Sequence, residues 1–379
     1  MFIHESHLPQ VLSPECYFSA EQHERELATV FEPAWHYVAS LSDFPEDGSF
    51  VTCELFGRPL ILWRVDGQIQ AFLNVCAHRF STLQTAACGT ASRIKCPYHG
   101  WEYDQSGNTC RIPDAKSFRP MGNAARALVK YPTETRGDLV FVRLTEAGPS
   151  LSDSNKKLMQ FCDESLTGDF DRNLTLDWDV DANWKIVVEN AIESYHVAFV
   201  HQATFGGTPP EEMCEHKLEK DWTSFQIKLA NGKQRKPYHP LEGFVYRVMG
   251  HRWGAGYYHC FCYPNVLVSA EHIFRTVMIV TPLSPTRCRM KFHMFAQRGT
   301  NRNAFANFVF RQVCRFAARF TTRVMQEDRA LWPGLQVGIQ SPQRPSPGLI
   351  SAREERVFHF QQHIHDLTQL DQQPERSAA

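Results

Sequence analysis

Two short motifs place two cysteines and two histidines within one stretch of the chain. Cys76-Ala77-His78 supplies the pattern C-x-H, and Cys96-Pro97-Tyr98-His99 supplies C-x-x-H. Two thiolates and two imidazoles are the ligand set of a [2Fe–2S] centre in which cysteines hold one iron and histidines hold the other. Neutral imidazoles raise the reduction potential of such a centre, so the motifs predict a cluster that accepts electrons from ordinary reduced donors.

Zinc is the competing occupant of this ligand set. Structural zinc sites with two cysteines and two histidines usually keep the cysteines together and the histidines together. Here each motif mixes one cysteine with one histidine. The mixed order favours the cluster, and a structural zinc or four unrelated core residues are the alternatives.

A second group of metal-ligand residues lies between residues 183 and 201. It contains Glu193 and the pattern H-x₄-H formed by His196 and His201. On an ideal helix these two imidazoles point about 140° apart, so they can share one metal only if the helix bends or ends between them. Two histidines and a carboxylate from elsewhere would suit an Fe(II) that keeps positions open for O₂ and substrate. Taken alone, two histidines on a helix are more often partly exposed or core residues than metal ligands.

The first motif pair lies in a region that reads as short strands. Turn signals such as Asp66-Gly67 separate the apolar runs from Trp35 to Leu144, which predicts an all-β module. Strands are expected at residues 51–55, 59–65 and 138–144, and a linker at residues 147–154.

The second half of the chain reads as mixed helix and strand. A helix is expected over residues 183–201, antiparallel strands between 222 and 297, a long helix over 303–330 and a final helix over 354–370. The expected fold class is therefore α+β. The expected domains are an N-terminal segment (1–35) packing on the catalytic domain, an all-β cluster domain (36–146), a catalytic iron domain (147–370) and a tail (371–379).

Composition excludes several functional classes. The 379 residues carry 40 basic and 41 acidic side chains, which argues against nucleic acid or an anionic membrane as a partner. We see no secretory signal and no membrane-spanning run. Twelve cysteines in such a chain are expected to be thiols and metal ligands in a reducing cytoplasm.

The two motif regions resemble Rieske non-haem iron oxygenases of the ring-hydroxylating superfamily, specifically their α (terminal oxygenase) subunits. Cys76-x-His78-Arg79 with Cys96-Pro97-Tyr98-His99-Gly100-Trp101 is similar to the Rieske domain, and residues 183–201 are similar to the iron motif. The resemblance extends over about residues 31–360. It implies that Cys76, His78, Cys96 and His99 hold the cluster, and that His196 and His201 hold a mononuclear Fe(II).

The resemblance also implies a third iron ligand on a C-terminal helix. The segment Gln326-Glu327-Asp328-x₇-Gln336 fits that position. Asp328 is the expected ligand, and Glu327 is the alternative. The implied catalytic domain has an antiparallel sheet flanked by helices.

Glu193 departs from the pattern of the aromatic-ring dioxygenases. In those enzymes the residue three before the first iron-ligating histidine is an aspartate that bridges the Rieske histidine of one subunit to the iron ligand of the next. Here it is a glutamate, as in the carnitine-type and related quaternary-ammonium monooxygenases. The resemblance implies that Glu193 accepts imidazole N–H groups from both centres and offers electrons a short path. A helix-surface glutamate that pairs with Lys185 or another basic residue is the alternative.

The function implied by the resemblance is that of a terminal oxygenase. It would use O₂ to hydroxylate or oxidatively demethylate a small organic substrate, aromatic or quaternary ammonium. Electrons would come from NAD(P)H through a separate reductase, often with a ferredoxin, and the chain would form a homotrimer. A cis-dihydroxylating aromatic-ring dioxygenase is one alternative, and a Rieske electron carrier without oxygenase activity is another.

The residues that contact the substrate are not apparent from the sequence. The segment Tyr257-Tyr258-His259-Cys260-Phe261 is rich in aromatic side chains. Such a strand builds core or lines a pocket, where aromatic rings can hold an aromatic ring or a trimethylammonium group.

Overall fold

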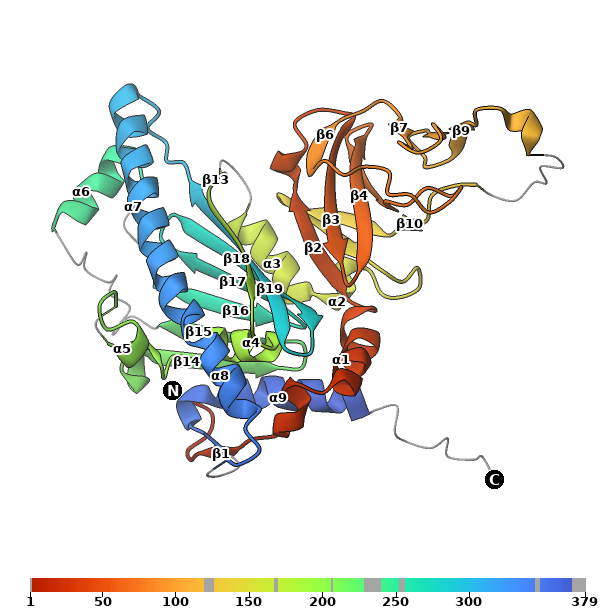
Figure 1. Ribbon diagram of the computed structural model, residues 1–379. Helices are drawn as coiled ribbons and strands as arrows, with labels where there is room; N and C mark the ends of the chain where they lie inside the picture. The colour runs from red at the N-terminus through yellow and green to blue at the C-terminus, as the bar shows by residue number, and fades with distance from the viewer. Residues whose placement is uncertain are drawn as a thin grey trace. The chain divides into compact units, whose positions relative to one another are not determined.

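The computed structural model describes residues 2–118, 126–166, 170–205, 207–227, 240–251, 256–344 and 348–369. The chain divides into two compact units, Phe31–Cys162 and the combination of Met1–Val30 with Asp163–Ala379 (Figure 1). The expected tail, 371–379, lies outside the described residues. None of the described helices is long and apolar enough to cross a membrane.

The unit Phe31–Cys162 is built from strands, as the sequence predicts. Its sheets have the strand orders β10-β5-β4-β3-β6, β11-β12-β2 and β7-β8-β9, and every pair is antiparallel. Asp66 and Gly67 join β4 to β5 with φ of 49° and 76°, the positive values that a type I′ hairpin turn requires. The strands are β2 (Trp35–Ser40), β3 (Ser49–Leu55), β4 (Arg58–Val65), β5 (Gln68–Leu73), β6 (Cys88–Thr90), β7 (Ile94–Lys95), β8 (Glu102–Tyr103), β9 (Thr109–Arg111), β10 (Lys130–Tyr131), β11 (Thr133–Arg136) and β12 (Leu139–Arg143).

The predicted linker is partly helical. Residues 151–154 form the short helix α2 (Leu151–Ser154), which is followed by α3 (Lys156–Ser165). The Ser150 side chain accepts the backbone N–H of Asp153 and caps the start of α2. Serine is common both in loops and at helix N-termini, so its presence did not distinguish a linker from a helix. The expected domain boundary after residue 146 lies inside the unit that ends at Cys162.

The other unit contains a seven-stranded antiparallel sheet with the order β13-β19-β18-β17-β16-β15-β14. The strands predicted between residues 222 and 297 are confirmed as β15 to β19. The strands of the sheet are β13 (Phe170–Val180), β14 (Cys214–Glu219), β15 (Trp222–Ile227), β16 (Tyr258–Cys262), β17 (Val266–Glu271), β18 (Phe274–Ser284) and β19 (Arg287–Gln297), and β1 (Leu8–Pro9) pairs with β20 (Leu349–Ile350).

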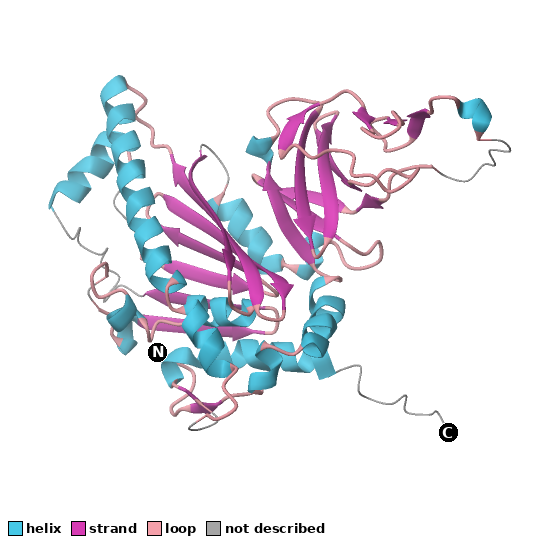
Figure 2. Cartoon of the chain, in the orientation of Figure 1, coloured by secondary structure: helices cyan, strands magenta, loops and turns pink. Residues whose placement is uncertain are grey.

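Helices flank this sheet (Figure 2), which confirms the α+β fold. Helix α7 packs against β13, and α4 packs against β18, β19, α8 and α9. The predicted long and final helices are confirmed as α7 and α9. The end of α3 also belongs to this unit. Its other described α-helices are α1 (Ala20–Glu26), α4 (Trp184–Ile192), α5 (Val197–Val200), α6 (Pro240–Met249), α7 (Ala304–Arg329), α8 (Trp332–Ile339) and α9 (Glu355–Gln369).

The helix predicted over residues 183–201 is broken, so that prediction is wrong in extent. Helix α4 stops at Ile192, and Glu193 is extended with φ −117° and ψ 170°. The Glu193 carboxylate accepts the backbone N–H groups of Tyr195 and His196. Backbone N–H groups at the start of a helical turn otherwise lack partners. The Glu193 side chain therefore marks both the end of α4 and the start of the next helical turn.

The start of α4 is fixed by a buried polar cluster. The Asn183 side chain accepts the N–H of Lys185 at 2.9 Å and caps the helix. Lys185 Nζ and Trp184 Nε1 both donate to the carboxylate of Glu26, at 2.6 and 2.7 Å. Lys185 is therefore the partner of Glu26 and not of Glu193.

Candidate metal centres

The predicted cluster residues lie on two loops that share one backbone geometry. In the first loop, the N–H of Phe80 donates to the carbonyl of Cys76, and the N–H of Cys76 donates to Ser81. In the second, Gly100 donates to Cys96, and Cys96 donates to Trp101. The fifth residue of each loop has a positive φ, 61° at Phe80 and 73° at Gly100. Each loop thus closes around its cysteine carbonyl.

The four side chains divide by type. Cys76 and Cys96 are buried in one apolar cluster with Trp63, Phe72 and Tyr103, and their thiols are close enough to interact. The rings of His78 and His99 lie edge to face with centroids 4.7 Å apart. His78 also stacks on Trp101 at 4.9 Å. The cysteines form one pair and the histidines the other.

This division fits two irons better than one zinc. Tetrahedral zinc holds all its ligands at about 2.0–2.3 Å, so every donor atom lies within about 4 Å of the others. Within the described ranges, no three of these four donors come within 4.8 Å of one another. His78 Nδ1 is buried and has no hydrogen-bond partner in the described chain, as expected of an atom that ligates a metal. Tyr103 donates to the Cys76 sulfur at 3.1 Å and accepts the N–H of Ala77 at 2.9 Å. A hydrogen bond to a ligand sulfur is one of the ways in which a protein sets the cluster potential.

The predicted iron residues also come together. His196 precedes α5, His201 follows it, and Asp328 lies in the last turn of α7. Asp328 Oδ1 is 3.5 Å from His196 Nε2 and 3.1 Å from His201 Nε2. Among the described residues these three form the group whose donor atoms all lie within 4.8 Å. The broken helix brings the two histidines to one side.

The donor atoms of this group are prepared for a cation. Asp328 Oδ1 is buried without a hydrogen-bond partner in the described part of the chain. A glutamate accepts the Nδ1–H of each histidine, Glu193 from His196 and Glu327 from His201, the second at 2.9 Å. In the neutral form of each ring, Nε2 then carries a lone pair directed at the same region as Asp328 Oδ1. Three converging acceptors repel one another unless a positive ion lies between them.

Glu327 has a role that the sequence did not reveal. The sequence left it as an alternative to Asp328, but its carboxylate binds His201 Nδ1 and the Thr204 hydroxyl at 2.9 and 3.0 Å. Tyr103 was missed as well, because nothing in its spacing connects it to Cys76. The adjacent Glu327-Asp328 pair could have indicated this role. Successive helix residues point about 100° apart, so one carboxylate can bind His201 Nδ1 while the other lies near His201 Nε2.

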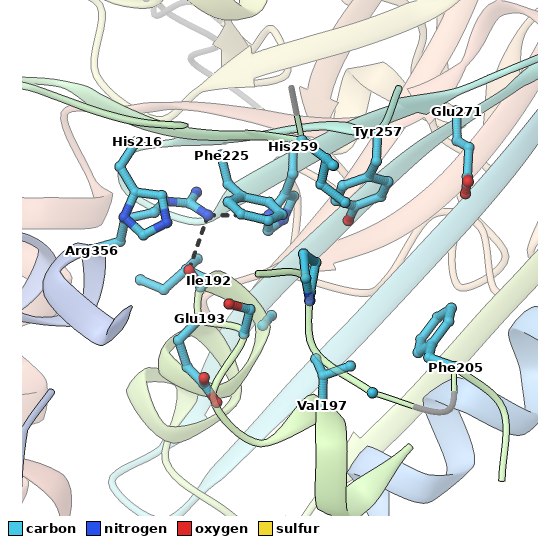
Figure 3. Close-up of a pocket in the computed structure, with 15 residues that line it drawn as sticks. Ile192, Glu193, Val197, Phe205, His216, Phe225, Tyr257, His259, Glu271 and Arg356 are labelled. Atoms are coloured by element: carbon cyan, nitrogen blue, oxygen red, sulfur yellow. Dashed lines mark hydrogen bonds between the residues drawn. The ribbon is translucent and has the colours of Figure 1, made fainter. Parts of the chain in front are cut away.

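A cavity of about 240 Å³ lies beside the iron group (Figure 3). Glu193 and Val197, on either side of His196, line it, and so does Phe205, whose ring meets His201 edge-on at 5.4 Å. From the aromatic strand, Tyr257 and His259 line it, because alternate residues of a strand face the same side. The remaining lining residues are Ala191, Ile192, Ser194, Gly207, Pro209, His216, Phe225, Ile227, Glu271 and Arg356.

Comparison with protein families gives two matches. Residues 34–132 match the Rieske [2Fe-2S] domain. Residues 168–370 match the ring hydroxylating alpha subunit (catalytic domain). Each match contains one of the two groups of residues described above.

Individual proteins resemble the chain over most of its length. It is 24% identical to the chloroplastic choline monooxygenase of Atriplex hortensis over 353 residues, 90% of this chain and 74% of that protein. The fold resembles that of a quaternary ammonium Rieske monooxygenase that oxidises carnitine, with TM-score 0.74, 20% identity and coverage of 96% and 95% of the two chains. It also resembles naphthalene 1,2-dioxygenase from Rhodococcus sp., with TM-score 0.72, 18% identity and coverage of 97% and 95%.

The family matches agree with the side chains that the fold brings together. The residues present fit a [2Fe–2S] cluster and a mononuclear iron, and no other grouping of metal ligands occurs in the described chain at comparable spacing. The chain belongs to the ring-hydroxylating α subunits, and it is a Rieske oxygenase whose cofactors are a [2Fe–2S] cluster and a mononuclear non-haem iron that uses O₂.

Proposed function

We propose that this α subunit hydroxylates or oxidatively demethylates a small organic substrate, aromatic or quaternary ammonium, in the cavity beside Val197 and Phe205. In this proposal His196, His201 and Asp328 hold the iron, and Cys76, His78, Cys96 and His99 hold the cluster. The main support is the convergence of both Nε2 atoms on an Asp328 oxygen that has no hydrogen-bond partner in the described chain. When bound, the cluster supplies single electrons and the iron activates O₂.

Glu193 is proposed to connect the two centres. It accepts the His196 Nδ1–H, and its second oxygen is held by the backbone of the same turn. A carboxylate that already orients one iron ligand can accept a second imidazole N–H from a cluster histidine. We propose that this second imidazole is His78 or His99 of a neighbouring subunit in a homotrimer. A structural relative has been described in terms of inter-subunit electron transfer.

The reductase partner of this Rieske oxygenase is proposed to draw its electrons from NAD(P)H, directly or through a ferredoxin. None of the twelve cysteines, which all lie within the described ranges, forms a disulfide. This supports a reducing compartment, and we propose the cytoplasm.

Metal analysis and product identification test the proposal. Anaerobically purified protein should be brown and carry three irons per chain, two in the cluster and one mononuclear. NAD(P)H-coupled oxygen uptake with a generic reductase should yield an oxidised product from a panel of aromatic acids, amines and betaines. Zinc at Cys76 and Cys96, or no metal at His196 and His201, would contradict the proposal.

The products distinguish the alternatives. A cis-diol from an aromatic probe identifies a dihydroxylating dioxygenase, for which the rings of Phe205, Phe225 and Tyr257 in the cavity also provide apolar contact. A monohydroxylated or demethylated product identifies a monooxygenase. Reversible reduction of the cluster without any product, in protein that lacks mononuclear iron, identifies an electron carrier.

Replacing Glu193 tests its bridging role. Glu193→Gln should keep the cluster, and the mononuclear iron when Fe(II) is supplied in excess, but lose nearly all product formation, because its single amide oxygen cannot accept both imidazole N–H groups. Rapid-mixing spectroscopy should show a cluster that is reduced but not reoxidised. Glu212→Gln, an exposed change, is the control. Unaltered turnover in Glu193→Gln would show that electrons take another path.

A further inference from the structure

Arg356 is a buried cation in the wall of the cavity. It lies in the first turn of α9 and is 1% exposed. Its guanidinium donates to the Thr223 hydroxyl at 3.0 Å, the Thr223 carbonyl at 3.3 Å, the Ile192 carbonyl at 2.9 Å and His259 Nδ1 at 3.2 Å. A guanidinium has five N–H groups, so these four contacts leave one for another acceptor.

The contacts of Arg356 with the described residues include no carboxylate. Glu355, its neighbour in sequence, directs its carboxylate to His216 and to the backbone N–H groups of Ile3 and His4. The groups that favour the charge of Arg356 most are Cys260 and Tyr263, a thiol and a phenol that are uncharged at neutral pH. Burial lowers the pKa of Arg356 to about 10, so the side chain remains charged at neutral pH.

Burying the Arg356 guanidinium without a carboxylate partner costs free energy, so a compensating interaction is expected. Burying a cation without a counter-ion costs several kcal/mol in real proteins. The Ile192 carbonyl lies at the carboxyl end of α4, and it supplies part of the compensation through the helix dipole. Helix capping alone does not require the guanidinium to line a cavity, which Arg356 does.

His259 adds a neutral donor on the same side. Its Nδ1 accepts from Arg356, and burial lowers its pKa well below the usual range. The neutral ring must then carry its proton on Nε2. Its hydrogen bonds to the described residues use Nδ1, and the ring lines the cavity.

The two sides of the cavity differ in charge. Figure 3 shows Arg356 and His216 on one side and Glu271 on the other, with the rings of Phe225 and Tyr257 between them. Glu193 also lies on the side of Arg356, but its carboxylate points away from the guanidinium. An anionic group therefore fits the side of Arg356, and an apolar or cationic group fits the opposite side.

We propose that the cavity selects substrates that carry a carboxylate, which binds the remaining N–H of Arg356 and the Nε2–H of His259. This inference rests on the proposed function, because it takes the cavity beside the iron residues as the substrate site. It adds the requirement for an acid, which applies equally to an aromatic and to a quaternary ammonium substrate. The rest of the substrate then lies against Phe225 and Tyr257.

Paired probes that differ only at the acidic group test this requirement. The pairs are benzoate with benzamide, and glycine betaine with choline. Binding is measured by calorimetry on the oxidised holoenzyme without a reductase, so turnover is not needed. In at least one pair the acid should bind about tenfold to a hundredfold more tightly, the range for a hydrogen bond to a charged group. No preference in either pair, or no binding of either acid, would overturn the inference.

Variants assign the preference to Arg356. Arg356→Gln should bind the acid and its neutral counterpart equally, whereas Arg356→Lys should keep part of the preference. Arg275→Gln is the matched control, because the half-buried Arg275 also donates to backbone carbonyls, those of His272 and Phe274, but does not line the cavity. If Arg356→Gln does not fold, His259→Phe keeps the cation, removes one donor and should weaken acid binding. An unchanged preference in these folded variants would contradict the assignment.

The experiments distinguish a failure of the acid requirement from a failure of the proposed oxygenase function. Oxidation of neutral substrates alone would leave the oxygenase proposal in place and overturn the acid requirement. Absence of mononuclear iron would overturn the oxygenase proposal, while the binding preference can still be measured.

Discussion

Each histidine of the iron group is held by a carboxylate of its own. Glu193 lies three residues before His196, whereas Glu327 reaches His201 across a sequence separation of 126 residues. Such partners fix the imidazole tautomer and raise the basicity of the ligating nitrogen. The two glutamates differ in one respect that matters, because only Glu193 lines the cavity. We therefore expect Glu327 to affect iron affinity and not the electron path.

Glu327→Gln should weaken iron binding by about tenfold to a hundredfold, the usual effect of removing such a partner. The cluster should be unaffected. Competition with an iron chelator measures the first quantity, and the visible spectrum of the cluster measures the second. Arg323→Gln is the control, since Arg323 is exposed and contacts Glu327 at 3.3 Å without touching His201. Equal iron affinity in Glu327→Gln and the native protein would contradict this role.

Phe80 occupies a backbone position that favours glycine. Its φ of 61° matches that of Gly100 in the second loop, and its side chain is 81% exposed. The left-handed conformation costs a residue with a Cβ roughly 1–2 kcal/mol. The greater freedom of glycine in the unfolded chain offsets part of this, by about 0.4–1 kcal/mol.

Phe80→Gly should therefore raise the free energy of unfolding by up to about 1.6 kcal/mol. Anaerobic thermal unfolding of the holoprotein, followed by loss of cluster absorbance, checks this expectation. Gly100→Ala in the equivalent position should lower the transition temperature. A lower transition temperature for Phe80→Gly would indicate that the Phe80 side chain makes a stabilising contact.

At the scale of elements, the position of the break after α4 could not be predicted from the sequence. Residues 183–201 contain neither glycine nor proline, so the pattern predicts an uninterrupted helix. The helix ends because Glu193 binds the backbone of the next turn, and glutamate is an ordinary residue inside helices. By contrast, α7 and α9 were predictable, since apolar periodicity and the absence of breakers continue through them. The sequence thus indicated that the helix must bend or end if His196 and His201 share a metal, but not which residue makes the break.

The connection of α1 to α4 depends on the buried pair Glu26 and Lys185. Both side chains are at most 1% exposed, and their charged atoms are 2.6 Å apart. Lys185→Met should lower the free energy of unfolding by about 3–5 kcal/mol, because Glu26 would remain buried without a counter-ion. Urea denaturation measures the change. The double variant Glu26→Gln with Lys185→Met should recover part of the loss, and a double variant as unstable as Lys185→Met would contradict the ion-pair explanation.

At the scale of the whole molecule, buried carboxylates that connect distant segments make stability depend on pH. Glu189 in α4 accepts the Tyr17 hydroxyl at 2.5 Å and a Gln361 N–H at 3.1 Å. It thereby joins the N-terminal segment to the last helix. Burial raises the pKa of Glu189 from 4.5 to about 7. The folded protein thus holds a proton that the unfolded chain releases between these values, so Glu189 lowers stability as pH rises from 4.5 to 7.

Glu189→Gln should remove this dependence. The variant should gain up to about 3 kcal/mol relative to the native protein between pH 5 and pH 8, from 1.36 kcal/mol per pKa unit. Glutamine still offers an oxygen to Tyr17, so the connection persists. Urea denaturation at both pH values gives the difference, and Glu24→Gln on the surface of α1 serves as the control. A gain that is the same at both pH values would show that Glu189 does not titrate in this range.

The architecture of both units was accessible from the sequence, but the connections between distant segments were not. The turn at Asp66-Gly67 and the alternation in β15 and β19 are local signals. The contacts of Gln336 with the Asn183 backbone, and of Gln361 with Glu189, join residues far apart in the chain. Local periodicity carries no information about which distant polar residue satisfies a buried group, so these contacts require the folded chain.

The Ile192 carbonyl connects the cavity wall to Glu193. Arg356 donates to the Ile192 carbonyl, and that same peptide bond continues into Glu193. Because the Arg356 guanidinium holds this carbonyl, it also helps to hold the backbone from which the Glu193 carboxylate extends. The cation in the cavity wall and the carboxylate that orients His196 are therefore joined through one peptide unit.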